Sequence, residues 1–221
     1  MQRVIAVDGP AGVGKSTASQ RLAARLGFHY LDTGAMYRAV GVLAVEAGVA
    51  LDDDAALAHL AADLRFEPAR SGAGVVVNGR DLSTLIRRAD AANLASRVST
   101  RAVVRERLVA LQRALGEAGP VVMEGRDIGT VVFPDAAVKF FLTADPAERA
   151  RRRAAELRAR GQAVDERALA AELAARDARD QERATSPLRP APDAIVLDTT
   201  DLDLAAVVDE MERRVRPHIG V

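Results

Sequence analysis

The first part of the sequence alternates short apolar runs with segments of helical periodicity. Residues 4–7 form a largely β-branched run, and apolar residues then recur at helical spacing across 18–26. Residues 28–31 have the pattern of a second strand and residues 35–47 that of a second helix, which Gly48 closes. Strands that alternate with helices in this way predict an α/β fold, in which helices cover a parallel sheet.

The pattern changes between Asp63 and Ala95. Residues 64–66 and 75–77 are typical of short strands, and the dipeptide Asn78-Gly79 is a strong signal for a hairpin turn. We therefore expect a small antiparallel insert over residues 63–95.

The remainder returns to the α/β pattern, with a long amphipathic helix, buried strands and Arg-rich helices. The final helix follows the final strand, so the end of the chain repeats the strand-and-helix unit of its beginning. The predicted elements are a helix over 98–115, strands over 121–123 and 138–142, helices from 146 to about 184, a strand over 194–197 and a helix over 204–215.

Composition excludes several classes of protein. The 31 basic residues balance 31 acidic ones, which removes the net attraction that binders of nucleic-acid polymers use. With no cysteine, the chain has neither a disulfide framework nor a thiolate metal site. The apolar run at 4–7 is too short for a signal-peptide core or a membrane span, which predicts a cytoplasmic protein without a membrane partner.

A phosphate-binding loop follows the first predicted strand and precedes the first predicted helix. Its glycines let backbone N–H groups turn toward phosphate oxygens, Lys15 reaches the β- and γ-phosphates, and Ser16 is placed to ligate Mg²⁺. The alternative is a glycine-rich turn that binds nothing. The motif consists of Gly9, Pro10, Ala11, Gly12, Val13, Gly14, Lys15, Ser16 and Thr17.

This P-loop alone does not separate switches, motors and small-molecule kinases. A guanine-nucleotide switch ordinarily carries an Asn/Thr-Lys-x-Asp motif, and neither Lys15 nor Lys139, the two lysines of the chain, lies in one. Further sites must therefore decide the function.

Two polar segments follow predicted strands at the carboxyl edge of the sheet, where α/β proteins bind ligands. The first carries Asp32, Thr33 and Arg38, although Asp32 or Thr33 could simply cap a helix. The second begins with Glu124, a carboxylate suited to the Mg²⁺ shell, and continues with Arg126, which is suited to phosphate. A local structural turn is the alternative for this second segment.

Arginines gather in the predicted helices after residue 146. Arg176, Asp180 and Arg183 fall on one helical face, which suits a phosphate and a sugar hydroxyl, but an exposed face with helical ion pairs is the alternative. A cationic helix suited to a lid over the triphosphate, or equally to a solvated face, carries Arg149, Arg152 and Arg153. The three histidines, His29, His59 and His218, have no metal-ligand spacing and are expected to be structural.

Taken together, these segments resemble the bacterial cytidylate kinases, the CMP/dCMP kinases of the nucleoside monophosphate kinase family. The resemblance covers essentially the whole chain, and its motifs are specific to the family in combination. They are D-G-P-x-G-x-G-K-S-T from Asp8, L-D-T-G-A-M-Y-R from Leu31, N-x-x-S from Asn93, G-R-D-I-G-T-V-V-F-P-D from Gly125, and R-D-x-R-D-x-x-R-x-x-x-P-L ending at Leu188.

The resemblance implies a role for each matching residue. It implies that Ser96, Arg105 and Asp127 bind the cytosine base and that Arg176 and Asp180 bind the ribose. It places Thr33, Arg38, Arg126 and Arg183 near the acceptor phosphate, and Tyr37 in the same acceptor site. Catalytic roles are expected for Lys15, Arg126 and Arg183, donor binding for the P-loop with Arg149 and Arg153, and metal binding for Ser16 and Glu124.

The family also implies an organisation and a reaction. We expect a monomeric P-loop kinase domain with a core at 1–62, 96–145 and 185–221, a monophosphate-binding insert at about 63–95 and a lid at about 146–184. ATP with Mg²⁺ would phosphorylate CMP and dCMP. The alternatives are a kinase for UMP, AMP or a non-nucleotide acceptor such as shikimate, and an ATP-driven regulatory protein.

Two positions depart from the common family pattern. Glu124 stands where a number of members carry aspartate, and Thr33 stands where serine is common. Because of Glu124, the sequence does not decide the geometry of the Mg²⁺ shell. Thr33 keeps the hydroxyl group that serine would supply.

Overall fold

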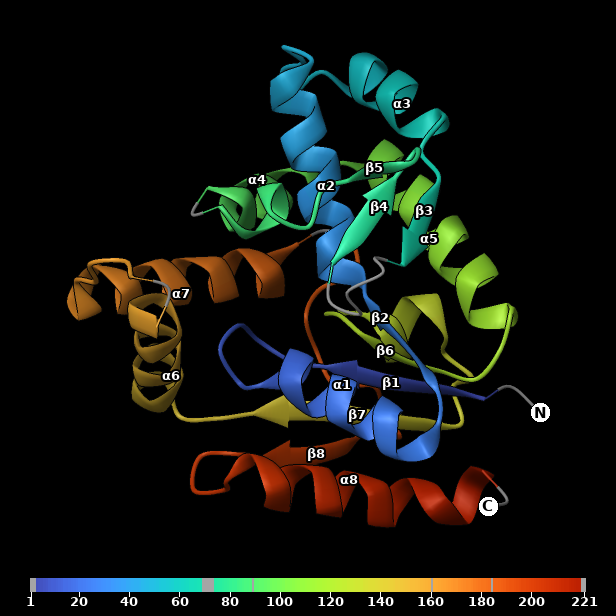
Figure 1. The fold of residues 1–221 in the computed structure, drawn as a ribbon, viewed down its shortest axis with the longest axis vertical. Helices are drawn as coiled ribbons and strands as arrows, with labels where there is room; N and C mark the ends of the chain where they lie inside the picture. The colour runs from blue at the N-terminus through green and yellow to red at the C-terminus, as the bar shows by residue number, and fades with distance from the viewer. Residues whose placement is uncertain (1–2, 69–73, 89, 160, 184, 220–221) are drawn as a thin grey trace. The chain divides into compact units, whose positions relative to one another are not determined.

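In the computed structural model, the chain forms two compact units, residues 1–30 with 119–221 and residues 31–118 (Figure 1). The structure describes residues 3–68, 74–88, 90–159, 161–183 and 185–219. The unit of residues 31–118 is larger than the insert expected at 63–95, and the division into core, insert and lid stays a prediction.

A five-stranded sheet of order β2-β6-β1-β7-β8 organises the first unit. The apolar strand β1 (Val4–Asp8) lies at its centre, is buried along its whole length, and pairs in parallel with both neighbours. Val7 is in register with Glu124 on one side and Phe140 on the other, so the carboxyl ends of three strands meet beside the P-loop. The other strands are β2 (His29–Asp32), β6 (Val121–Glu124), β7 (Val138–Thr143) and β8 (Ile195–Asp198).

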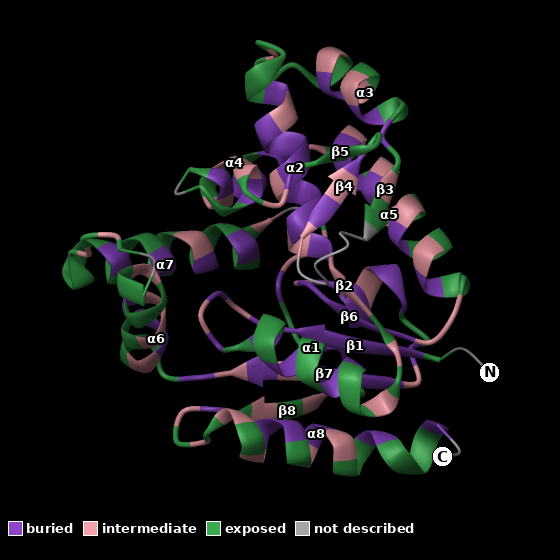
Figure 2. Cartoon of the chain, in the orientation of Figure 1, coloured by how far each residue is buried: buried purple, intermediate pink, exposed green. Residues whose placement is uncertain are grey.

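Helices α1 (Lys15–Leu26) and α8 (Leu204–Ile219) bury their apolar stripes against this sheet (Figure 2). Val208, Met211 and Val215 recur at helical spacing on the buried side of α8. The α/β class and the parallel sheet expected from the sequence are confirmed.

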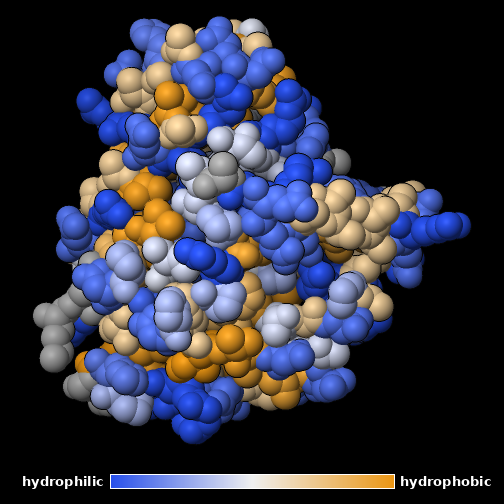
Figure 3. Space-filling view, turned by 180° about the vertical axis from the view of Figure 1, so that it is seen from behind, coloured by the Kyte–Doolittle hydropathy of each residue, from blue (hydrophilic) through white to orange (hydrophobic). Residues whose placement is uncertain are grey.

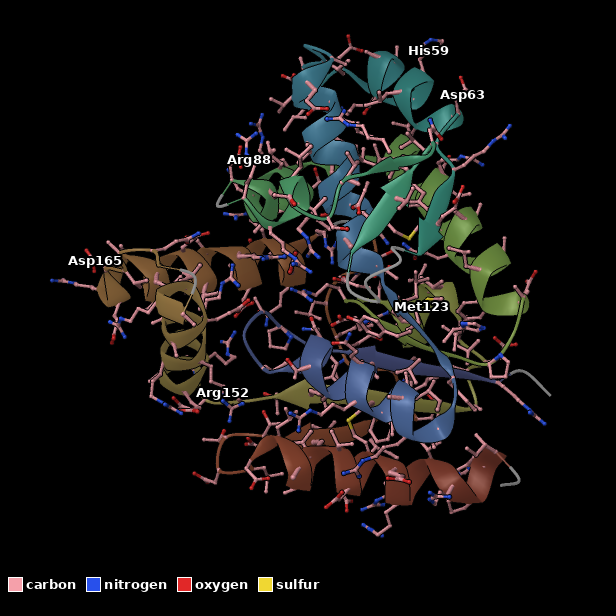
Figure 4. All side chains as sticks on the ribbon, viewed as in Figure 1. His59, Asp63, Arg88, Met123, Arg152 and Asp165 are labelled. Atoms are coloured by element: carbon pink, nitrogen blue, oxygen red, sulfur yellow. The ribbon has the colours of Figure 1, made fainter. Side chains whose placement is uncertain are left out.

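Helices α6 (Pro146–Ala159) and α7 (Glu166–Glu182) share a small apolar cluster, to which Ala11 of the P-loop also belongs. Ala154 of α6 packs with Leu169 and Leu173 of α7 in this cluster, while most other positions of both helices are exposed or only half buried. Asp165 begins α7 by accepting hydrogen bonds from two backbone N–H groups of its first turn (Figure 4).

The second unit surrounds its own core, which is centred on Met36, Leu57 and Leu108. Its three-stranded antiparallel sheet contains the expected hairpin, because Asn78 and Gly79 both take positive φ, 50° and 77°. The elements are α2 (Thr33–Glu46), α3 (Asp54–Ala62), β3 (Phe66–Pro68), β4 (Val75–Val77), β5 (Arg80–Asp81), η1 (Leu85–Arg87), α4 (Ala91–Val98) and α5 (Ala102–Glu117).

The long helix expected over 98–115 is present as α5, but it begins later, at Ala102, because Arg101 is extended before it. Two helices of this unit were not predicted. One is α4, which ends at Val98, and the other is α3, which Asp53 caps by accepting a hydrogen bond from the N–H of Ala56. Asp followed three residues later by a helix former was the signal for that cap.

Figure 3 shows one face of the protein, on which hydrophilic residues are interspersed with smaller hydrophobic areas. Among the described residues, the large apolar side chains that remain exposed are Val45 and Val196. No described helix combines the length and apolar character needed to cross a membrane.

Candidate active site

The backbone of the P-loop can be built only with glycine at its first position. Gly9 has a φ of 143°, and a Cβ at this position would lie 2.1 Å from the carbonyl oxygen of Leu142 in β7. Gly12 and Gly14 also have positive φ, 81° and 88°, and Gly14 is the residue from which α1 begins. The loop is therefore tightly fitted between a strand end and a helix N-terminus, the arrangement that exposes backbone N–H groups to an anion.

Lys15 is buried within this loop. Its Nζ donates a hydrogen bond to the carbonyl of Pro10 at 2.6 Å, which folds the side chain back over the loop. Burial lowers the pKa of Lys15 to about 7, the charge of Arg126 lowers it further, and Glu124 opposes the shift. A phosphate here would supply the negative charge that favours the ammonium form.

The side chains of Ser16 and Glu124, for which metal binding stays a prediction, are in contact with each other. The exposed Ser16 hydroxyl donates to Glu124 Oε2 at 3.0 Å, and the buried Glu124 carboxylate also accepts a hydrogen bond from the hydroxyl of Tyr30 on Oε1. A hydroxyl and a carboxylate are hard oxygen donors of the kind that hold Mg²⁺ together with phosphate oxygens and water. This donor set fits the ion, and sequence reasoning had missed Tyr30.

Asp8 is a second residue that sequence reasoning left without a role. Its two carboxylate oxygens accept hydrogen bonds from the backbone N–H groups of Ile128 and Gly129, at 2.9 and 2.8 Å. Burial raises the pKa of Asp8 to about 6, the N–H donors partly offset this, and Asp127 raises it further. Asp8 thus fixes the segment that follows β6 against the start of the P-loop. A carboxylate directly after a buried strand was the available signal.

Arg126, Asp180 and Arg183 form one charged cluster. Arg126 Nε donates to Asp180 Oδ2 at 3.0 Å, and Arg183 Nη2 lies 4.0 Å from Asp180 Oδ1. Burial alone would raise the pKa of Asp180, but the charges of Arg126, Arg183 and Arg176 lower it below its usual value. The structure therefore gathers three arginines around one carboxylate.

The position of Arg183 differs from the sequence prediction. Helix α7 ends at Glu182, and Arg183 has an extended backbone with φ −55° and ψ 131°, so it does not share the helical face of Arg176 and Asp180. It reaches Asp180 from beyond the helix end instead, donating from Nε to the Asp180 carbonyl at 3.3 Å. The backbone N–H of Leu188 also donates to that carbonyl, at 2.7 Å.

The three arginines expected on the lid helix have different surroundings. Arg149 is buried, donates to the carbonyl of Ala11 in the P-loop at 3.2 Å, and pairs with Asp177 of α7. Arg152 donates to the carbonyls of Thr199 and Thr200 after β8, at 2.6 and 3.1 Å, and is therefore an anchor of α6 (Figure 4).

Arg153 is more exposed than Arg149. Its guanidinium pairs with Glu156 one turn further along α6, at 2.6 Å. Binding of the phosphate donor by Arg149 and Arg153 stays a prediction. Arg149 donates a hydrogen bond to the P-loop carbonyl of Ala11, whereas the ion pair of Arg153 lies within α6.

In the second unit, Asp32 caps α2, as its alternative interpretation proposed. Its Oδ1 accepts from the N–H of Ala35 at 2.9 Å, and its Oδ2 pairs with Arg38 at 2.7 Å. Thr33, the first residue of α2, is buried. Asp32 thus orients the guanidinium of Arg38.

Tyr37 and Arg105 lie together in this unit. The guanidinium carbon of Arg105, on α5, is 6.0 Å from the centroid of the Tyr37 ring, on α2, which is cation–π range. Both residues are buried, as is Ser96 of α4. The unit therefore holds buried polar side chains on three helices.

Asp127 is buried in the first unit, at the start of η2 (Ile128–Val132), a π-helical turn. Its carbonyl accepts from the N–H of Val131 at 2.9 Å. π-helical turns are rare in proteins, and those that occur are often found at functional sites. The three histidines are exposed, and no cluster of three His, Cys, Asp or Glu residues suited to a metal occurs in the described ranges.

Comparison with solved structures identifies the fold. A gluconokinase from Sinorhizobium meliloti superposes with a TM-score of 0.52 at 14% identity, covering 98% of this chain and 93% of that one. The protein TT1252 from Thermus thermophilus gives a TM-score of 0.51 at 18% identity, with 98% and 97% covered. Identities this low bear on the fold alone, and the first of these names is that of a kinase.

Comparison of sequences is more specific. The family model described as Cytidylate kinase matches residues 5–217. The cytidylate kinase of Geobacter sp. (strain M21) is 47% identical over 219 residues, 98% of this chain and 94% of that protein. The cytidylate kinase of Geobacillus kaustophilus is 50% identical over 218 residues, 98% and 97% of the two chains. A match of this extent, on a chain whose P-loop, carboxylate and arginines are assembled as described, shows that the chain belongs to the cytidylate kinase family.

Proposed function

We propose that this chain transfers the γ-phosphoryl group of ATP to CMP and dCMP, giving CDP and dCDP. The observation that carries the proposal is the family match over residues 5–217, which includes the P-loop and the arginine cluster around Asp180. The acceptor phosphate already carries an anionic oxygen, so the reaction needs no nucleophile from the protein. Catalysis then depends on alignment and on neutralisation of charge.

The donor site consists of the P-loop and its surroundings. Backbone N–H groups of the loop and the N-terminus of α1 hold the phosphates, and Lys15 exchanges its bond to Pro10 for one to the transferred group. Ser16 and Glu124 would hold Mg²⁺, which would supply neutralisation of the negative charge of the triphosphate. Arg149 and Arg153 are the proposed lid contacts of the triphosphate.

The acceptor residues come from both units of the chain. In the first unit, Arg126 and Arg183 bind the acceptor phosphate, Arg176 and Asp180 hold the ribose, and Asp127 reads the base. The cluster supports this because the guanidinium groups of Arg126 and Arg183 are already oriented by one buried carboxylate. In the second unit, the proposed residues are Thr33, Tyr37 and Arg38 for the acceptor phosphate and Ser96 and Arg105 for the base.

A coupled assay of ADP formation tests the proposal. With MgATP as donor, CMP and dCMP should be phosphorylated with kcat/KM at least tenfold above that for UMP or AMP. Preference for AMP, UMP or a non-nucleotide such as shikimate would identify a different acceptor. Slow ATP hydrolysis that no acceptor accelerates would instead indicate an ATP-driven regulatory protein.

A further inference from the structure

The side chains of Tyr30, Glu124 and Ser16, which come from three different elements, are linked by two hydrogen bonds. Tyr30 of β2 donates from its hydroxyl to Glu124 Oε1, and Ser16, at the start of α1, donates to Glu124 Oε2 at 3.0 Å. β2 and β6 are neighbours in the sheet, and β6 is the neighbour of β1, which leads into the P-loop. Each carboxylate oxygen of Glu124 therefore has its own hydroxyl donor.

The residues linked by these hydrogen bonds differ in exposure. Ser16 is exposed at the site where the nucleotide is proposed to bind, whereas Glu124 is only 3% exposed. The ring of Tyr30 packs against the apolar core of the first unit, with residues that include Val122 and Leu22. Tyr30 thus approaches the carboxylate from the core side and leaves the Ser16 side available to a ligand.

A glutamate in this position needs such a support. It has one more rotatable bond than aspartate, so more conformational freedom must be lost before its carboxylate faces Ser16. A buried carboxylate oxygen without a donor would also be unfavourable, and the Tyr30 hydroxyl supplies that donor.

We propose that Tyr30 is a positioning residue, whose hydroxyl holds the Glu124 carboxylate in the orientation that binds the Mg²⁺ of the nucleotide complex. The inference deepens the proposed function, on which it rests for the identity of the nucleotide. Tyr30 itself contacts neither metal nor nucleotide and acts through Glu124. Groups that orient metal-binding side chains in this way commonly contribute 10- to 100-fold to metal affinity.

The test is the affinity of Tyr30→Phe for ATP with and without Mg²⁺, measured by calorimetry. Phenylalanine keeps the packed ring and removes only the hydroxyl. The Mg²⁺ ratio, which is the ATP affinity measured with Mg²⁺ divided by the ATP affinity measured in EDTA, should fall roughly tenfold. The affinity for ATP in EDTA should stay within about twofold of wild type. Both affinities are binding constants, so the ratio can be measured without turnover.

Two comparison variants separate positioning from a general loss of structure. Ser19→Ala removes another buried hydroxyl from α1, one that has no partner among the described residues, and should leave the ratio unchanged. In a Glu124→Ala background the Tyr30→Phe change should have no further effect on the ratio, because the two residues act through one contact.

An unchanged Mg²⁺ ratio in Tyr30→Phe would overturn the proposal, and so would a loss that persists undiminished in the Glu124→Ala background. Equal losses with and without Mg²⁺ would likewise overturn it, since they would show a purely structural effect. Failure of the proposed function is distinguishable: the wild-type chain would then fail to phosphorylate CMP, while the Mg²⁺ ratio of each variant could still be measured.

Discussion

Asp8 and Lys15 are buried charged groups whose pKa values move in opposite directions beside the same loop. Burial raises the pKa of Asp8 to about 6 and lowers that of Lys15 to about 7. Burial disfavours the charged form of each group, which explains both signs. Asp8 nevertheless accepts two backbone hydrogen bonds, so its structural role does not depend on being near a ligand.

The raised pKa of Asp8 predicts a pH dependence of stability. Between the ordinary value of 3.8 and about 6 the folded state binds more protons than the unfolded state, so stability falls as pH rises through this window. Asp8→Asn removes this contribution, which is at most about 3 kcal/mol. Urea unfolding should therefore show that the unfolding free energy falls less between pH 4.5 and pH 7.5 for the variant than for wild type.

Asp201→Asn provides the matched control for this measurement because Asp201 is exposed. It should follow the wild-type pH profile. If Asp8→Asn also follows that profile, the raised pKa of Asp8 is refuted.

Arg183 has its guanidinium beside a buried carboxylate and is proposed to bind the acceptor phosphate. Arg183→Ala should lower kcat for CMP by roughly 100-fold or more, because a fixed positive charge on the transition state is lost. The affinity for MgATP should remain within about threefold. Arg183→Lys keeps the charge without the planar guanidinium and should fall between the two.

The comparison variant for Arg183 is Arg213→Ala on α8, where the guanidinium is exposed and pairs with Glu210. This change should leave turnover unaltered. Wild-type turnover in Arg183→Ala would show that Arg183 does not take part in phosphoryl transfer.

At the scale of elements, the turn from β1 into α1 depends on a close approach of strand β7. A methyl group on Gly9 would meet the Leu142 carbonyl at 2.1 Å, in a backbone conformation that L-residues rarely adopt. Gly9→Ala should cost about 3 kcal/mol or more, of which roughly 1–2 is backbone strain and the rest overpacking. Denaturant unfolding and nucleotide titration should both detect the change.

Gly27→Ala isolates the backbone part of that cost. Gly27 ends α1 with a φ of 67°, and apart from Gly27 and its two neighbours in the chain no described residue approaches the position of a Cβ within 4 Å. We expect a loss of about 1 kcal/mol and unchanged nucleotide affinity. Equal losses in the two variants would contradict the role of the Leu142 contact.

Element types were more predictable than their ends. The strands at 121–124 and 138–143 were found because they are short apolar runs bounded by turns. The start of α5 was predicted four residues too early, at Val98, because Ser99, Thr100 and Arg101 separate it from α4 without a glycine or proline to mark the break. Hydrogen bonds decide that break, such as the one from the Ser99 hydroxyl to the Ser96 carbonyl at 2.9 Å.

At the scale of the whole molecule, the chain forms two compact units with separate cores. The first unit is discontinuous in sequence, since the chain leaves it after residue 30 and returns at residue 119. Hydrophobic periodicity is a local property, which is why it predicted the strands and helices but not this grouping.

The α/β class and the P-loop followed from the amino-acid sequence alone, because glycine spacing and alternating apolar runs are local patterns that directly constrain the backbone. The resemblance to the family was carried by its five sequence motifs in combination. Only the tertiary structure decided which side chains share a hydrogen bond. It placed Tyr30 on Glu124, Asp8 on the backbone of Ile128 and Gly129, and Arg183 beyond the end of α7. The partners of Tyr30 and Asp8 are far apart in sequence and are brought together by the pairing of strands, whereas Arg183 reaches the nearby Asp180 only because α7 ends before it.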